Sequence, residues 1–207
     1  SRLASSSAEY PLVVVKSTVL PGTTQTIIIP ALEAASRKQA GKDFGVCVCP
    51  EYLREKHAYA DALRPPAVVI GVDDVAAGDA LEALFKPFDA PIFRLSMRAA
   101  ELQKYAHNLF NAVKIAFFNE MRGAADADYA SELDAVFAAT VLSSEGLWNA
   151  SYGTRDRGPF MGSCLPKDVE AFIAWSQTEV HDATIVRAAL QSNLALAKAL
   201  KSANQDS

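Results

Sequence analysis

The strongest constraint on the fold is a change of pattern near residue 95. Before that point, short β-branched runs alternate with helical segments, which is typical of a parallel sheet with crossover helices. The predicted strands are residues 12–16, 44–49, 67–72 and 92–95, and the predicted helices are residues 25–39 and 74–85. Pro21-Gly22 marks a turn, and Thr23 or Thr24 is a suitable N-cap for the first helix. The first part of the chain is therefore predicted to be α/β.

After Ser96 the pattern becomes all-α. The longest segment, residues 97–121, carries a row of large apolar side chains: Leu102, Tyr105, Leu109, Phe110, Val113, Phe117 and Met121. About 25 residues at 1.5 Å each give a helix of roughly 37 Å, long enough to be the spine of a domain. Residues 132–142 and 184–201 are further helices, and residues 143–161 form a loop long enough to carry function. We expect two domains, residues 1–95 and 96–207.

Composition excludes several functional classes. A net charge of −4 and the lack of a basic block argue against a nucleic-acid surface. Apolar runs such as residues 12–15 are too short to cross a bilayer. No secretory leader is visible, so we expect a cytoplasmic protein. The first strand lacks the preceding neighbour that a buried parallel strand needs, so we expect the chain to be part of something larger.

The cysteines and histidines predict neither a disulfide framework nor a metal site. Three cysteines are an odd number. Cys47 and Cys49 alternate along a predicted strand, and we expect them on opposite faces of it. The three histidines are scattered and form no metal-binding pattern.

Residues 162–168, Gly-Ser-Cys-Leu-Pro-Lys-Asp, place a thiol at the start of a predicted helix. The positive end of the helix dipole and the ammonium of Lys167 both favour the thiolate of Cys164, which is the nucleophilic form. The alternative is a structural cysteine buried in a loop.

Polar groups also recur along the long helix and at the ends of the predicted strands. Lys104, Asn108 and Asn111 share one face, and Asn119 lies near the same line; this row either faces water or lines a cavity. Glu51 and Glu55 would share a face if residues 50–55 were helical, as on many exposed helices. Ligands of open α/β sheets bind beyond the carboxyl ends of strands, which is also where Thr18 and Glu51 lie. The chain contains no Gly-x-Gly-x-x-Gly loop.

Together these motifs resemble the UDP-glucose/GDP-mannose dehydrogenase family. The resemblance covers about residues 11–200, in the family's order, and its GDP-mannose branch is the most similar. It is carried by Lys16-Ser17-Thr18-Val19-Leu20-Pro21-Gly22-Thr23, Pro50-Glu51-Tyr52-Leu53-Arg54-Glu55, Ala100-Glu101-Leu102-Gln103-Lys104-Tyr105-Ala106-His107-Asn108, Asn119-Glu120 and Gly162–Asp168.

The resemblance implies a fold and a set of partners. Residues 1–95 would be the end of a Rossmann-type NAD domain, and residues 96–207 a helical central domain that forms a homodimer through its long helix. The substrate would be a nucleotide sugar, GDP-mannose or UDP-glucose, whose C6 alcohol is oxidised to a carboxylate with NAD.

The resemblance also implies residue roles. Cys164 would attack an aldehyde intermediate and carry a thioester. Lys104 and Asn108 would stabilise oxyanions, Asp168 would position water, and Glu51 and Thr18 would handle protons, with help from Glu55. The remaining contacts would be Asn111, Asn119, Tyr152 and Arg155 to the nucleotide sugar, and Thr18 and Lys167 to NAD.

A second hypothesis belongs to a different class. Met161 stands where the family usually has glycine, and a glycine there could serve a positive φ or a close approach to a ligand. If so, the chain would be a dimerisation module with a degenerate site.

Overall fold

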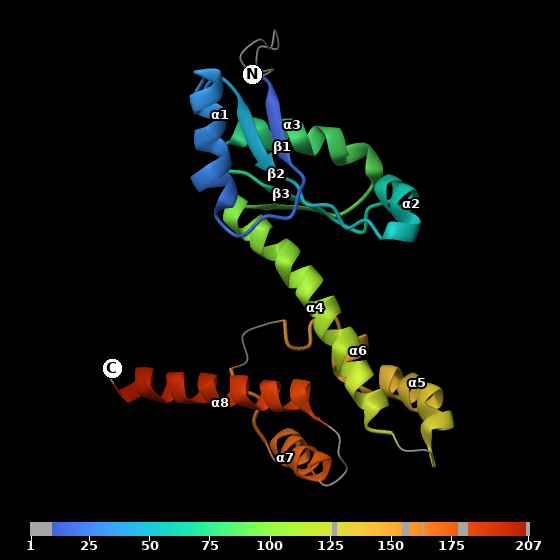
Figure 1. Ribbon diagram of the computed structural model, residues 1–207. Helices are drawn as coiled ribbons and strands as arrows, with labels where there is room; N and C mark the ends of the chain where they lie inside the picture. Colours follow the sequence, from blue (N-terminus) through green and yellow to red (C-terminus); the bar gives the residue numbers. More distant parts are fainter. Residues whose placement is uncertain (1–9, 126–127, 155–157, 163, 178–181, 206–207) are drawn as a thin grey trace. The chain divides into compact units, whose positions relative to one another are not determined.

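A computed structural model describes residues 10–125, 128–154, 158–162, 164–177 and 182–205 (Figure 1). The chain divides into two compact units, Ser1–Leu109 and Phe110–Ser207. The long helix α4 (Met97–Gly123) contributes residues to both. The domain boundary predicted after residue 95 stays a prediction.

The first unit contains a four-stranded sheet in the order β1 (Leu12–Val15), β2 (Gly45–Val48), β3 (Val68–Gly71) and β4 (Ile92–Leu95). The β1–β2 and β3–β4 pairs are parallel, whereas β2 and β3 are antiparallel and pair at Val48 and Gly71. The prediction of a parallel sheet is therefore correct for the outer pairs and wrong for the central one. Two parallel strands begin at the same end of the sheet, so the connection between them must cross back over the sheet, usually as a helix. The β2–β3 connection contains only η2 (Glu55–His57) and the short α2 (Ala58–Leu63), which buries no residue.

Helices follow the other strands. The predicted helix 25–39 is divided just before Pro30 into a π-helical turn, η1 (Thr24–Ile28), and α1 (Ile29–Ser36). Proline has no N–H for an intrahelical bond, so a change of helix type is expected there. Arg37 ends α1 in the left-handed region at φ 58°. Between β3 and β4 lie α3 (Val75–Phe85), capped by the Asp74 carboxylate, and η3 (Lys86–Phe88).

The sheet is covered on both faces, by α1 and by α3 (Figure 1). Val46 and Val48 of β2 pack on one face in a cluster with Met97 and Ala100 of α4. Cys47 and Cys49 share the other face in a cluster that includes Val68, Ile70, Ala77 and Leu81. The expectation that the two cysteines point to opposite faces is wrong, because residues two apart on a strand point to the same face.

The second unit contains only helices in its described part: the end of α4, η4 (Ala130–Glu132), α5 (Leu133–Ser143), α6 (Glu145–Trp148), α7 (Leu165–Ser176) and α8 (Thr184–Gln205). The predicted loop 143–161 thus contains one helical turn. The rings of Phe118 and Phe137 join α4 to α5, with centroids 5.1 Å apart. The Glu120 carboxylate joins α4 to α8 by accepting the N–H of Ile185 at 2.7 Å and of Val186 at 3.2 Å.

Within the described ranges, no helix combines the length and the apolar character that crossing a bilayer requires.

Candidate active site

The carboxyl edge of the β1–β2 pair gathers two predicted site residues. Thr18 follows β1 and is exposed, and Glu51 follows β2 and is half-buried. Glu51 accepts the backbone N–H of Leu53 through Oε2 at 2.6 Å. A cavity of about 270 Å³ lies beside Glu51, with Lys16, Cys49, Pro66 and Phe85 among its lining residues.

Residues 50–55 are not a helix, so the predicted shared face of Glu51 and Glu55 does not form. Residues 51–54 have no regular secondary structure, and Glu55 begins η2. The side chain of Glu55 lies outside the described part of the chain. Glu51 is oriented instead by its bond to Leu53 within this turn.

Lys104 is the buried member of the polar row on α4. Its side chain is 6% exposed, and its Nζ donates a hydrogen bond to the main-chain oxygen of Glu51. The ammonium also lies over the ring of Tyr52, 4.9 Å from the centroid. Lys104 is therefore an interior residue and does not face water. The predicted neighbours Asn108, Asn111 and Asn119 are exposed on α4.

The start of α4 is held close to the sheet at Gly71. A Cβ at this position would come 2.5 Å from the Cβ of Ala100 and 3.0 Å from the Cα of Met97. Real Cβ atoms do not approach so closely, so a larger residue would push α4, and Lys104 with it, away from the sheet.

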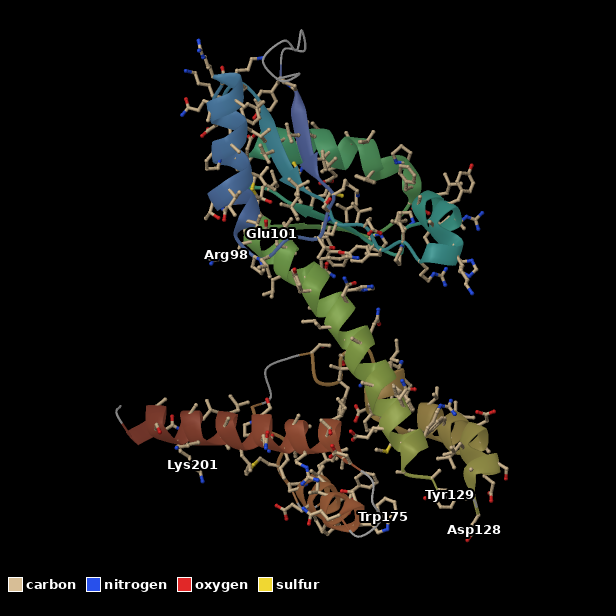
Figure 2. The ribbon with its side chains drawn as sticks, in the orientation of Figure 1. Arg98, Glu101, Asp128, Tyr129, Trp175 and Lys201 are labelled. Atoms are coloured by element: carbon tan, nitrogen blue, oxygen red, sulfur yellow. The ribbon has the colours of Figure 1, made fainter. Side chains whose placement is uncertain are left out.

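Glu101 is a buried carboxylate of α4 for which the sequence motifs predicted no role. It is 2% exposed, and its carboxylate accepts the N–H of Gly22 and, at 2.8 Å, the N–H of Thr24. It lies at the start of α4, beside the beginning of η1 (Figure 2). A threonine hydroxyl was predicted to cap this helix, but Thr23 makes no side-chain cap bond. The Glu101 carboxylate instead accepts a backbone N–H at the start of η1. Glu101 precedes Lys104 by three residues, and residues at this spacing lie on the same face of a helix. The sequence could have indicated the position of Glu101 in this way.

Cys164 is the N-cap residue of α7 and is exposed. Its carbonyl accepts the N–H of Asp168 at 2.9 Å, which begins the helix. Lys167 Nζ lies 3.3 Å from Asp168 Oδ1, and both side chains are about 70% exposed. The prediction of a thiol at a helix start is therefore confirmed, and the alternative of a buried loop cysteine is wrong. The remaining cysteines differ, because burial raises the pKa of the Cys47 thiol to about 11 and also raises that of Cys49.

Tyr152 lines a second cavity, of about 710 Å³, together with Phe160, Met161, Leu165 and others. The Asn193 amide fixes one wall of this cavity, because it accepts the N–H of Phe160 at 2.6 Å and donates to its carbonyl at 3.1 Å. The predicted sugar ligand Arg155 lies outside the described residues.

Met161 is not strained, although the sequence analysis raised that possibility. Its side chain is 73% exposed, and φ is not positive there. The neighbouring Gly162 has a positive φ of +93°. A side chain at position 161 therefore carries no backbone cost of the kind that would require glycine.

The structure thus brings together Glu51 and Lys104 in the first unit. Cys164, Lys167 and Asp168 adjoin one another in the second unit, and their approach to Lys104 stays a prediction. Within the described ranges, no group of three or more His, Cys, Asp or Glu side chains is arranged to hold a metal ion.

Comparisons with known proteins connect these two units to one family. Residues 1–89 match the NAD binding domain of the UDP-glucose/GDP-mannose dehydrogenase family, and residues 98–195 match its central domain. The chain belongs to the UDP-glucose/GDP-mannose dehydrogenase family. The resemblance seen in the sequence motifs is thereby confirmed, and the two matches cover nearly all of the chain.

Individual family members show the same relationship. The chain is 46% identical over 162 residues to a GDP-mannose 6-dehydrogenase of Pseudomonas putida, covering 77% of this chain and 36% of that protein. It is 34% identical over 190 residues to the UDP-glucose 6-dehydrogenase AglM of Haloferax volcanii, covering 88% and 43%.

Among solved structures, a ternary complex of GDP-mannose dehydrogenase from Pseudomonas aeruginosa matches with a TM-score of 0.82. The sequence identity is 36%, and the match covers 93% of this chain and 44% of that one. The chain therefore spans less than half the length of these family members.

Proposed function

We propose that this chain is part of a longer NAD-dependent nucleotide-sugar 6-dehydrogenase that oxidises GDP-mannose to GDP-mannuronate. The observation that carries the proposal is the buried Lys104 ammonium, which is held on the Glu51 carbonyl beside the carboxyl edge of β1 and β2. A fixed cation in a site of low dielectric can stabilise negative charge that develops on a substrate oxygen. UDP-glucose is the alternative substrate, supported by the likeness to the Haloferax enzyme.

Each side chain has a proposed task. The Cys164 sulfur would add to an aldehyde carbon, forming a C–S bond while the carbonyl oxygen takes up a proton. After the second oxidation the sulfur would be held in a thioester, and water would cleave the C–S bond to release a carboxylate and the thiol. Lys104, with Asn108, would stabilise the oxyanions of these steps, and Asp168 would position the water.

Glu51, Thr18 and Glu55 would move protons during hydrolysis. Asn111, Asn119, Tyr152 and Arg155 would contact the nucleotide sugar. The cavity supports the assignment of Tyr152, which lines it together with apolar side chains and the polar residues Ser192 and Asn193.

The residues present fit part of an NAD site. The parallel β1–β2 pair ends at one edge, where Thr18 is exposed, and dinucleotides bind beyond such an edge in Rossmann-type sheets. Thr18 and Lys167 would hold the cofactor. When bound, NAD supplies a hydride acceptor.

We also propose a cytoplasmic homodimer that assembles through α4. This helix exposes large apolar side chains, which commonly mark interfaces: Leu102, Leu109, Phe110, Val113 and Ile115 are each 54–63% exposed. Sedimentation of the chain as a monomer at micromolar concentration would contradict the dimer.

The function is tested with the full-length enzyme that carries this chain. We expect NADH to form with GDP-mannose, at least about tenfold faster than with UDP-glucose at equal concentration, because loss of designed polar contacts typically costs that much or more. Absorbance of NADH and chromatography of the sugar product measure both steps. Preference for UDP-glucose would support the alternative substrate, and no NADH with either sugar would contradict the proposal.

The second candidate function is a non-catalytic dimerisation module, supported by the same exposed face of α4. Alkylation with iodoacetamide at pH 8, followed by peptide mass spectrometry, distinguishes the two. If Cys164 is the catalytic nucleophile, we expect it to react faster than a small exposed thiol such as glutathione, because catalytic cysteines are activated by their surroundings. Cys47 should react at least about 10²-fold more slowly than Cys164, because it is buried and about one thiol in a thousand is ionised at pH 8.

The comparison with glutathione decides between the candidates. A Cys164 rate no higher than that of glutathione would indicate exposure without activation, and would favour the dimerisation module.

A further inference from the structure

Tyr52 lies against α4 at two points. Its hydroxyl donates a hydrogen bond to the side-chain oxygen of Gln103, and its ring meets the imidazole of His107 edge-on, with centroids 4.9 Å apart and planes inclined by 60°. Gln103 and His107 are four residues apart and therefore lie on adjacent turns of one helix face. The two contacts fix both the position and the tilt of the ring.

The Lys104 ammonium rests on this ring. Its Nζ lies 4.9 Å from the Tyr52 centroid and also donates to the main-chain oxygen of Glu51, the preceding residue. One short segment after β2 thus contacts the ammonium with a carbonyl dipole and with the negative face of an aromatic ring. Such a cation–π contact is strongest when the cation is removed from water, as Lys104 is at 6% exposure.

The neighbouring carboxylates are engaged with other groups. Glu51 Oε2 accepts the N–H of Leu53, and Glu101 accepts the N–H groups of Gly22 and Thr24. The carbonyl and the ring are therefore the groups that keep the Lys104 cation in place.

We propose that Tyr52 is a positioning residue for Lys104, whose ring holds the ammonium so that one of its N–H bonds remains directed at a substrate oxygen. The importance of this for catalysis rests on the proposed function. An ammonium has three N–H bonds. The Glu51 carbonyl and the Tyr52 ring take two of these directions, and in this proposal the third N–H points to the substrate.

The phenol remains a donor throughout the working range of pH. Burial, followed by the neighbouring Cys49, raises the pKa of Tyr52 to about 12. Because the group is neutral below that pH, the bond to Gln103 is kept at neutral pH.

Nuclear magnetic resonance of this chain tests the geometry without any need for activity. With lysine labelled with ¹³C at Cε, we expect the Lys104 signal, assigned by its loss in Lys104→Met, to be shifted upfield by the ring current of Tyr52. The shift should remain in Tyr52→Phe, which keeps the ring. It should disappear in Tyr52→Leu and in Tyr52→Met, whose flexible side chain fills a similar space if the leucine variant does not fold. Tyr59→Leu is the matched control, because Tyr59 is 81% exposed.

Kinetics of the full-length enzyme test the consequence. We expect kcat to fall about tenfold in Tyr52→Leu and Tyr52→Met, with KM changed less, and to recover in Tyr52→Phe. An unshifted Lys104 signal in the wild-type chain, or a shift that survives removal of the ring, would overturn the proposal. So would a normal kcat in variants that have lost the shift. A shifted signal in an enzyme with no turnover on either sugar would leave the geometry intact and contradict the proposed function instead.

Discussion

The Cys164→Ser variant of the full-length enzyme is expected to form the aldehyde and to stop there, with formation of the sugar acid reduced about 10³-fold or more. Cys164 is the exposed N-cap of α7, so its thiol is accessible to a substrate carbon. A serine hydroxyl at this position is hardly ionised at neutral pH and is a far weaker nucleophile. In the proposed mechanism the second oxidation proceeds through a covalent adduct on sulfur, so it should be affected more than the first.

Chromatographic separation of aldehyde and acid, together with NADH counted per sugar, measures this result. The matched control is Cys47→Ala, which removes a buried thiol of the sheet core and should leave the products unchanged. Formation of the acid at the wild-type rate by Cys164→Ser would exclude the thioester route.

The Lys104→Met variant is expected to lose about 10²–10³-fold in kcat, as other enzymes do when an oxyanion donor is removed. Methionine keeps most of the apolar stem that packs at this buried position and removes only the cation. The effect should therefore appear in the chemical step rather than in folding, and thermal denaturation of the same preparation checks this.

Single-turnover measurements separate the two oxidation steps in this variant. Lys114→Met is the matched control, because Lys114 is an exposed lysine of the same helix. A kcat of Lys104→Met within about threefold of the wild-type value would be a much smaller loss than removal of an oxyanion donor causes. This result would show that the ammonium does not act on the reacting oxygen.

Local patterns predicted most elements of the fold. The strand 92–95 and the start of the long helix at Met97 agree with the structure, because hydrophobic periodicity and turn residues act over a few neighbouring positions. The direction of β3 was missed, since strand pairing depends on contacts between distant segments. The helix predicted over residues 25–39 is divided into η1 and α1, and the π-helical form of η1 was not predicted.

The site shows the same division. Helix spacing placed Lys104 and Asn108 on one face, but only the packing of the Glu51–Tyr52 segment against α4 makes the first buried and leaves the second exposed. The role of Glu101 depends on a loop nearly eighty positions earlier, which no periodic pattern relates to it.

From the sequence alone came the family, the α/β-then-helical order of elements and the residue types available for chemistry, because these depend on local patterns and on motifs. The tertiary structure alone decided which of these residues are buried and paired: the Lys104 ammonium between a carbonyl and a ring, and the Glu101 carboxylate on two backbone N–H groups. The reason is physical, since desolvation and hydrogen bonding are set by whichever segment packs against a side chain, and that segment is distant in the chain.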